Sequence, residues 1–392
     1  MILDHVNDEA AFRASVREWL TQVVPQQPKP AESGDSKARY EPIARWWMSE
    51  LNKQGLGTPH WPKQYGGVAL SIRLQAILAQ EFARADAPTA SIFNIARNHV
   101  PATLLAWGTE EQKRKYLPEI SNGTVWCQGF SEPGAGSDLA SLQTRAVRQG
   151  DHYVINGQKT WSTYSMYADR ALLLARTDPS IPKHGGISFF LMDMKDPGIE
   201  IRPIHQVNGE ADFGELFLTD VRIPIEDRVG EEGQGWTVAQ STLSAERGLL
   251  SFQAAERLRY VMERFQRESV AQKRRWISEP ELTQSFVKLF ARLQAIRNLM
   301  RDMLFSDHAT DGSGPIMSAS VKILYSTLRK DWGNFLCETE GPDAILEENI
   351  GDDLSGGGEY VYLSAFSLII GGGTNEIMRN IIAERGLGLP KG

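Results

Sequence analysis

Glu246 is the residue whose type and position first indicate chemistry. It lies in the stretch from Thr237 to Val270, where apolar residues recur with the period of a helix. Leu243 precedes Glu246 by three residues and Leu250 follows it by four, so we expect all three on one helix face. A carboxylate on an apolar face is costly unless paired, and burial raises its pKa toward that of a useful general base. The alternative is a structural salt bridge, with Arg247 as the adjacent partner.

A glycine-rich segment, SEPGAGSD, runs from Ser131 to Asp138. Pro133, Gly134 and Gly136 favour a tight turn whose backbone N–H groups can approach an anion, and Ser137 adds a hydroxyl donor. Such a turn suits a pyrophosphate. An ordinary surface turn is the alternative.

An aromatic residue with two hydroxyl neighbours, Trp161-Ser162-Thr163, follows shortly after Asn156-Gly157. The Asn-Gly pair is typical of a two-residue hairpin turn. The indole could stack on a planar cofactor while a hydroxyl bonds its edge. The alternative is a buried tryptophan with two polar strand neighbours.

Three glycines, Gly371 to Gly373, precede Thr374 and the stretch NEIMRNIIAERGLG. Thr374 is expected to cap a helix, which Gly386 or Gly388 would end. The glycines indicate close backbone approach, either to a ligand or at a sharp turn between helices.

The periodicity predicts three domains and an α+β fold. Residues 1–122 read as helices, one of which begins at the capping box of Thr109 and Gln112 and ends before Pro118. Residues 123–232 change to short strands with a period of two, typical of a small barrel or sandwich. Residues 233–392 are helical again, as in a bundle. There is no GxGxxG after a strand, which argues against a Rossmann nicotinamide site.

Composition excludes several classes of protein. The 392 residues carry a net charge of −7, which argues against nucleic-acid binding, and no apolar run reaches the length of a membrane span. The N-terminus has no apolar signal region, and two cysteines make no disulfide framework, so we expect a cytoplasmic protein. The seven histidines show no metal-binding spacing, so we expect no metal.

Taken in order along the chain, these motifs resemble the acyl-CoA dehydrogenases over nearly the whole length. The resemblance is carried by WPKQYGG, LLAWGTEEQKRKYLPEI, CQGFSEPGAGSDLASLQT, INGQKTWST, LSAERGLL and GGGTNEIMRNIIAERGLGLP. It implies an N-terminal helical domain, a middle β-domain and a C-terminal four-helix bundle. It also implies FAD bound between the β-domain and the bundles of two neighbouring subunits, usually in a tetramer.

The resemblance also implies roles for individual residues. The flavin contacts in the β-domain would be Gln128, Phe130, Ser131, Trp161 and Thr163. Thr374 and Glu376 would contact the flavin from the bundle. Ser137 would be shared by the flavin phosphate and the CoA moiety, and Arg247 would contact the adenine end of CoA.

The reaction implied is the α,β-dehydrogenation of an acyl-CoA thioester, giving a trans-2 double bond. A glutamate takes the α-proton while the β-hydrogen leaves as hydride to flavin N5. In many members that glutamate stands at the position of Gly372, which cannot accept a proton. A subset similar to isovaleryl-CoA and long-chain dehydrogenases carries the base in a Leu-x-x-Glu-Arg pattern instead, and Leu243 to Arg247 fits that pattern. Gly372 would then offer its N–H to the thioester carbonyl.

Two segments depart from the family pattern. In many members a segment with a phenylalanine reaches the FAD of a neighbouring subunit; the corresponding stretch here, QKRRWISEPELTQ (residues 272–284), has Trp276 where that phenylalanine is usual. Residues 345–358 lack a usual flavin-binding motif. Both departures are similar to bacterial dehydrogenases of steroid or side-chain breakdown, some of which are heteromeric. The chain is therefore expected to be an active FAD enzyme, alone or as the catalytic partner of a heteromer. The alternatives are a non-catalytic subunit and a flavin oxidase or monooxygenase on the same fold.

The resemblance implies an acyl-CoA substrate and an electron-transferring flavoprotein as the acceptor, in a homotetramer or a heterotetramer. The small residues Gly371 to Gly373 favour a pocket for branched or bulky acyl groups.

Overall fold

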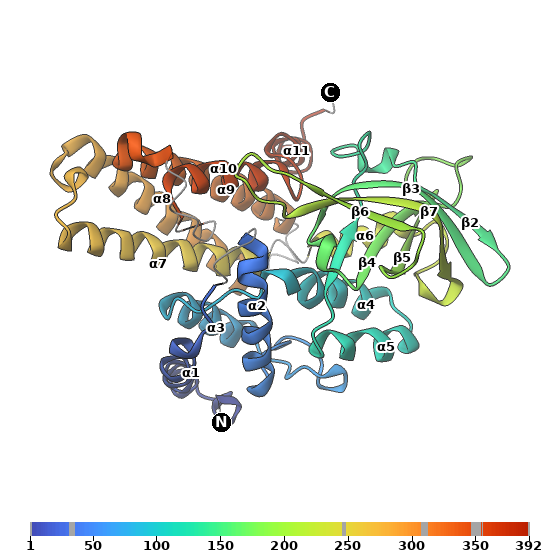
Figure 1. The fold of residues 1–392 in the computed structure, drawn as a ribbon, viewed down its shortest axis with the longest axis horizontal. Helices are drawn as coiled ribbons and strands as arrows, with labels where there is room; N and C mark the ends of the chain where they lie inside the picture. Colours follow the sequence, from blue (N-terminus) through green and yellow to red (C-terminus); the bar gives the residue numbers. More distant parts are fainter. Residues whose placement is uncertain are drawn as a thin grey trace. The chain divides into compact units, whose positions relative to one another are not determined.

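The computed structural model describes residues 2–30, 36–244, 248–306, 313–345, 354 and 356–390. These residues form two compact units. The first unit comprises described residues of 26–70 and 88–244, and the second comprises those of 2–25, 71–87 and 248–390. Along the chain the order is N-terminal helices, a middle β-domain and C-terminal helices, as the sequence predicted (Figure 1). The predicted domain boundaries at residues 122 and 232 stay a prediction.

The β-domain of the first unit is one eight-stranded sheet (Figure 1). Its strands are β1 (Trp126–Gly129), β2 (Arg145–Gln149), β3 (His152–Thr163), β4 (Arg170–Arg176), β5 (Ile187–Asp193), β6 (Ile199–Ile204), β7 (Phe213–Pro224) and β8 (Arg228–Val229). The order is β6-β7-β3-β2-β4-β5-β8, and β1 adds to β4. β4 pairs in parallel with β1 and β2, whereas the other pairings are antiparallel.

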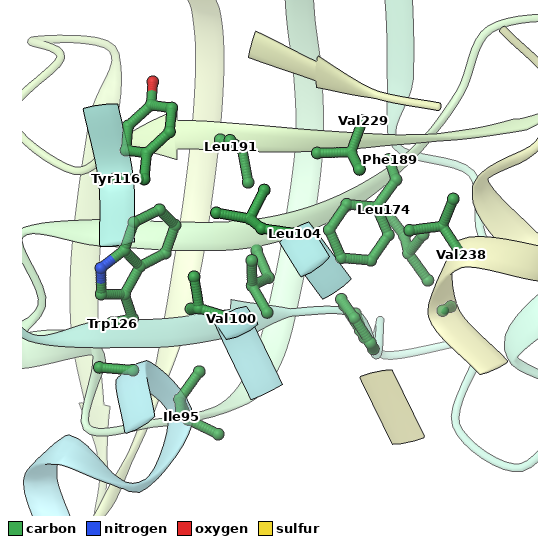
Figure 2. Packing of buried hydrophobic residues seen from close by; sticks show 14 of the residues in the cluster. Ile95, Val100, Leu104, Tyr116, Trp126, Leu174, Phe189, Leu191, Val229 and Val238 are labelled. Atoms are coloured by element: carbon green, nitrogen blue, oxygen red, sulfur yellow. The ribbon is translucent and has the colours of Figure 1, made fainter. Parts of the chain in front are cut away.

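Strand β4 is buried on both faces, so its sequence is a continuous apolar run. Leu172 and Leu174 face one core, which fills the space between the sheet and the helices (Figure 2). Ala171, Leu173 and Ala175 face a second core formed with strands β3 and β7. The sheet therefore folds over itself, in keeping with the predicted barrel or sandwich.

Helices of the first unit pack against one face of this sheet: η5 (Ile95–His99, a π-helix), α4 (Val100–Trp107), α5 (Glu110–Ser121) and α6 (Gly235–Ser244). Helix α2 (Ser36–Lys53) belongs to the same unit. Val100, Leu104 and Tyr116 pack with Trp126 and Leu191 in Figure 2. Helix α6 is fixed by a buried hydrogen bond of 2.6 Å between Thr103 Oγ1 and Thr242 Oγ1.

Helix α5 is longer than the sequence predicted. Thr109 and Gln112 form the expected capping box, but the helix continues through Pro118 to Ser121. Tyr116, Leu117 and Ile120 are fully buried, and this packing outweighs the backbone hydrogen bond that a proline cannot donate.

The Asn156-Gly157 pair is not a hairpin turn. Strand β3 runs through it, and the β2–β3 hairpin turns at Gly150 and Asp151 instead. The pair lies at a shift in the β3–β7 register, where Asn156 Nδ2 donates to Asp220 Oδ1 (2.9 Å). Gly157 is required there because an added Cβ would lie 2.7 Å from Thr144 Cα. Between the pairs Ile155/Val221 and Gly157/Leu218 the extra residue lies on β7, so Asn156 stands opposite a β-bulge and not in a turn.

The second unit is a helical bundle joined by two N-terminal helices. It contains α1 (Glu9–Val23), α3 (Ile72–Arg84), α7 (Leu249–Ala271), α8 (Pro280–Phe305), α9 (Gly314–Glu340), α10 (Gly358–Ile370) and α11 (Asn375–Ile381). Its core includes Trp276, 2% exposed, whose ring stacks on Phe265 and contacts Phe286. The residue that departs from the family pattern is therefore part of its own unit's core.

The predicted helix from Thr237 to Val270 is wrong as a single element. Helix α6 ends at Ser244, and α7 begins at Leu249 after Gly248, whose ψ of −113° is not helical. Leu243 packs on a core of the first unit, whereas Ala254 packs on the core of the second. Leu243 and Leu250 therefore do not share one continuous helix face, and Glu246 itself lies outside the described residues.

None of the described helices is both long and apolar enough to cross a bilayer. Within the same residues, no cluster of three or more His, Cys, Asp or Glu side chains could hold a metal ion.

Candidate functional site

The glycine-rich segment forms a closed turn at the end of β1. Glu132 N–H donates to the Ala135 carbonyl (3.1 Å), and Ala135 N–H donates back to the Glu132 carbonyl (3.0 Å). A Cβ built on Gly134 or Gly136 would have no atom within 4 Å. The chain itself thus leaves the space above these glycines open, which fits the close approach of a ligand.

A buried ion pair lies under this turn. Lys159 Nζ donates to Glu132 Oε1 (2.8 Å) and to the Phe130 carbonyl (3.1 Å), and the lysine side chain is fully buried. The Glu132 carboxylate also accepts from the N–H groups of Gln143 (2.6 Å) and Thr144 (2.9 Å). Burial lowers the pKa of Lys159 to about 8, although Glu132 opposes that shift. Sequence reasoning missed this pair.

Trp161 stands in a second irregularity of β3. The β3–β7 register shifts between Lys159 and Ser162, and Trp161 adopts a left-handed φ of +59°. This conformation is uncommon for a bulky side chain, and such strain concentrates at functional sites. The indole is 57% exposed and rests edge-on against Phe213, with ring centroids 5.8 Å apart. The bulge therefore turns the indole outward, so the buried-tryptophan alternative is wrong.

The turn and the bulge are joined. Thr160 N–H donates to the Ser131 carbonyl (2.9 Å), which places the residue before Trp161 against the start of the turn. Phe130 is only 6% exposed and packs against Phe189, so only its main chain remains to contact a ligand. Ser131 and Thr163 are half-buried, and Ser137 is exposed beyond the turn.

Gln128 and Ser131 present donors that the described chain does not use. Gln128 Nε2 is buried, and no described residue accepts a hydrogen bond from it. The Ser131 N–H likewise has no acceptor among the described residues. With the exposed indole and the open glycines, these donors fit a planar, hydrogen-bonding cofactor that carries a phosphate chain. The residues present therefore fit FAD.

The Gly371–Gly373 turn belongs to the second unit and joins α10 to α11. Gly372 and Gly373 both have left-handed φ angles, +64° and +95°, which favour glycine. Thr374 caps α11 as predicted, because its Oγ1 accepts from Ile377 N–H (3.2 Å). Glu376 is exposed and paired with Arg379 (2.8 Å). Glu246 and Arg247 lie outside the described residues.

A buried polar contact holds this turn against α9. Asn375 is 4% exposed, and its Oδ1 accepts from Lys322 Nζ (2.8 Å) and Ser326 Oγ (3.1 Å). Lys322 Nζ also donates to the Ile369 carbonyl near the end of α10 (2.8 Å). Both sides of the glycine turn are thus fixed to one lysine.

We expect Asn375→Ala to lower the free energy of unfolding by about 2 kcal/mol, because it removes the acceptor of a charged and a neutral donor. Urea denaturation of wild type and variant measures the change. Asn380→Ala, an exposed change on α11, is the matched control and should cost less than about 0.5 kcal/mol. Equal stabilities for the two variants would contradict the role given to Asn375.

Comparison with known proteins bears on this site. Residues 7–124, 127–221 and 233–387 match the N-terminal, middle and C-terminal domains of acyl-CoA dehydrogenase, respectively. The acyl-CoA dehydrogenase IpdE1 of Mycobacterium tuberculosis is 34% identical over 391 residues, which cover 98% of this chain and 99% of the relative.

Two solved structures are similar in fold and sequence. One, described as "Tcur3481-Tcur3483 steroid ACAD", has a TM-score of 0.81 and 32% identity, covering 98% of each chain. The other is the ChsE4-ChsE5 complex from Mycobacterium tuberculosis, with a TM-score of 0.79 and 31% identity, again covering 98% of each chain.

Proposed function

This chain belongs to the acyl-CoA dehydrogenase family of FAD-dependent oxidoreductases, and on that premise we propose that it forms a trans-2 double bond in an acyl-CoA thioester. The observation that carries the proposal is the exposed indole of Trp161, whose backbone is strained. Thr160 joins this residue by a hydrogen bond to Ser131, at the start of the glycine-rich turn, where donors are left without described acceptors. An indole held in this way provides a stacking surface for a flavin ring.

Glu246 is the proposed base for the α-proton. Gly372 leaves the usual position of the base without a side chain, and its N–H is proposed to polarise the thioester carbonyl, which stabilises the developing enolate. The left-handed φ of Gly372 supports this assignment, since a residue with a side chain would be strained there. Arg247 is proposed to contact the adenine end of CoA.

Flavin contacts are proposed in each unit, as in the family, where FAD lies between the β-domain and the bundles of neighbouring subunits. Gln128, Ser131 and the Phe130 main chain would hold the ring together with Trp161 and Thr163. Ser137 would contact the flavin phosphate and the CoA, and Thr374 and Glu376 would contact the flavin from the bundle. When bound, FAD supplies the acceptor for two electrons. An electron-transferring flavoprotein is the proposed oxidant of the reduced enzyme.

The test is the absorbance of the purified chain. We expect flavin bands that bleach when acyl-CoA is added without oxygen, and that recover with an electron-transferring flavoprotein. Flavin bands that no member of a broad acyl-CoA panel bleaches would contradict the proposed reaction.

A partner-dependent subunit is a second candidate, and one observation favours it. Trp276 is buried in its own unit, so it is not available to reach a neighbour's flavin. Two similar solved structures are described by pairs of chains, Tcur3481-Tcur3483 and ChsE4-ChsE5. A colourless purified chain that takes up FAD only with a second related chain would establish a heteromer, and the mass of the complex tells whether it is a heterotetramer. Bound FAD in a tetramer of this chain alone would establish a homotetramer.

The substrate is proposed to carry a branched or ring-bearing acyl group. The exposed Gly371 and Gly372 offer no side chains that would fill space, and one similar structure is described as a steroid enzyme. A panel assayed with a dye acceptor tests this proposal. A higher kcat/KM for short straight chains than for branched ones would contradict it.

A further inference from the structure

Lys159 is a charged residue whose side chain is fully buried in the described structure. The side chain has no exposed surface, and its ammonium is held by only two described groups, Glu132 Oε1 and the Phe130 carbonyl. Burying an ammonium costs several kcal/mol unless good hydrogen bonds offset that cost. A buried lysine in the middle of a strand therefore indicates a specific use.

The Glu132 carboxylate is also held by the backbone. It accepts from two backbone N–H groups, those of Gln143 and Thr144, just before β2. Burial would raise the pKa of Glu132, but Lys159 and these hydrogen bonds hold it below its usual value. The carboxylate thus stays ionised and fixes where the ammonium of Lys159 lies.

The second acceptor of Lys159 lies in the peptide group that joins Phe130 to Ser131. Its oxygen, on Phe130, accepts from the ammonium (3.1 Å), while its N–H belongs to Ser131. A cation on the oxygen polarises the whole peptide group and makes its N–H a stronger donor. No described residue accepts from this N–H.

Ser131, which carries this N–H, is also held at its carbonyl group. The Ser131 carbonyl accepts from Thr160 N–H (2.9 Å), and Thr160 lies between Lys159 and Trp161 on β3. One strand segment therefore supplies the cation, the backbone donor and the exposed indole. These bonds fix the main chain of Ser131 against the main chain that precedes Trp161.

We propose that Lys159 is a positioning residue that fixes and polarises the Phe130–Ser131 peptide, so that the Ser131 N–H donates to the flavin ring and stabilises its reduced state. This inference rests on the proposed flavin site. The stabilisation follows because the reduced ring carries more negative charge, for which a polarised donor has the greater affinity. Lys159 would thus set the reduction potential without touching the flavin or the substrate.

The test requires a variant that folds. Lys159→Met alone would leave Glu132 buried and unpaired, which is strongly destabilising. The double variant Glu132→Gln/Lys159→Met removes both charges at nearly constant volume. The N–H groups of Gln143 and Thr144 donate to different oxygens of Glu132, so the introduced amide oxygen can still accept from one of them. Circular dichroism establishes that it folds.

We expect the double variant to bind FAD, with an affinity for reduced FAD that falls about tenfold more than that for oxidised FAD. Its midpoint potential, measured by dye equilibration, becomes more negative accordingly. The single variant Lys159→Arg, with Glu132 unchanged, keeps a cation at this position. Its midpoint potential should lie between those of wild type and the double variant. The matched control is Glu119→Gln/Arg170→Met, which removes another ion pair of the first unit (2.8 Å) away from the turn and should leave the potential unchanged.

A merely structural role gives a different result. If the double variant loses stability but keeps the wild-type midpoint potential, Lys159 only fastens the strand to the turn, and the inference is overturned. Failure of the proposed function shows separately, in wild-type protein that binds no FAD or is not reduced by acyl-CoA.

Discussion

Glu246→Gln is expected to keep FAD bound and to lower the rate of flavin reduction by acyl-CoA about a thousandfold. Glutamine has the size of glutamate but cannot take the α-proton. Because Glu246 is not proposed to touch the flavin, the flavin bands and the FAD affinity should stay those of wild type. Anaerobic stopped-flow measurement of flavin bleaching gives the rate directly, independent of any electron acceptor.

The matched control is Glu268→Gln, which removes an exposed carboxylate from α7. It should leave the rate within about twofold of wild type, because surface substitutions of this kind rarely disturb a distant site. The structural alternative, a salt bridge with Arg247, predicts that Glu246→Gln lowers stability and leaves bleaching intact. Undiminished bleaching in a folded variant would refute the assignment of the base.

The sequence predicted the order of the elements and most of the residues that the site would use, but not the local backbone. Asn156-Gly157 and Trp161 were both recognised, yet the spacing predicted a hairpin and a regular strand. A bulge depends on the register with β7, which lies roughly 50 to 65 residues farther along the chain, and the local sequence does not encode that register. The exposure of Trp161 follows from the bulge, so the local sequence could not predict it either.

The interruption between α6 and α7 shows a second limit. The apolar residues of 237–270 keep one helical period across Gly248, so periodicity alone predicts one helix. The two halves pack on different cores, and tertiary packing decides where each helix ends. The motif that carries Glu246 was recognisable from its residue types. The argument from one continuous helix face was wrong.

The ion pair of Lys159 and Glu132 was missed although both residues stood in recognised motifs. The glycines and the proline of SEPGAGSD favour a pyrophosphate-binding turn or an ordinary surface turn, and neither interpretation gives Glu132 a role. A signal did exist, because Lys159 follows Ile155 on a strand whose alternate residues face the core. A lysine at such a position requires a buried acidic partner.

The largest effect on stability is expected at Glu81, in the second unit. This carboxylate is 2% exposed and accepts from Arg13 (2.8 Å), Arg17 (2.9 and 3.0 Å) and Arg84 (2.7 Å). It joins α1 to α3. We expect Glu81→Gln to lower the free energy of unfolding by about 3 kcal/mol, because three guanidinium groups lose their counter-charge. Urea denaturation at neutral pH measures the loss, and Glu200→Gln, which removes an exposed partner of Arg202, should cost less than about 1 kcal/mol.

The stabilisation by the Glu81 carboxylate is expected to depend on pH. Burial alone would raise the pKa of Glu81, but hydrogen bonds from Arg17, Arg84 and Arg13 lower it to about 2. In the unfolded chain a glutamate has a pKa of about 4.3. Because the folded value is the lower one, the stabilisation is complete above about pH 5 and is lost as the pH falls toward 2. The difference in unfolding free energy between wild type and Glu81→Gln should therefore be constant from pH 7 to 5 and shrink steadily below that. A difference that persists unchanged at pH 3 would mean that Glu81 acts through its shape and packing, and not through its charge.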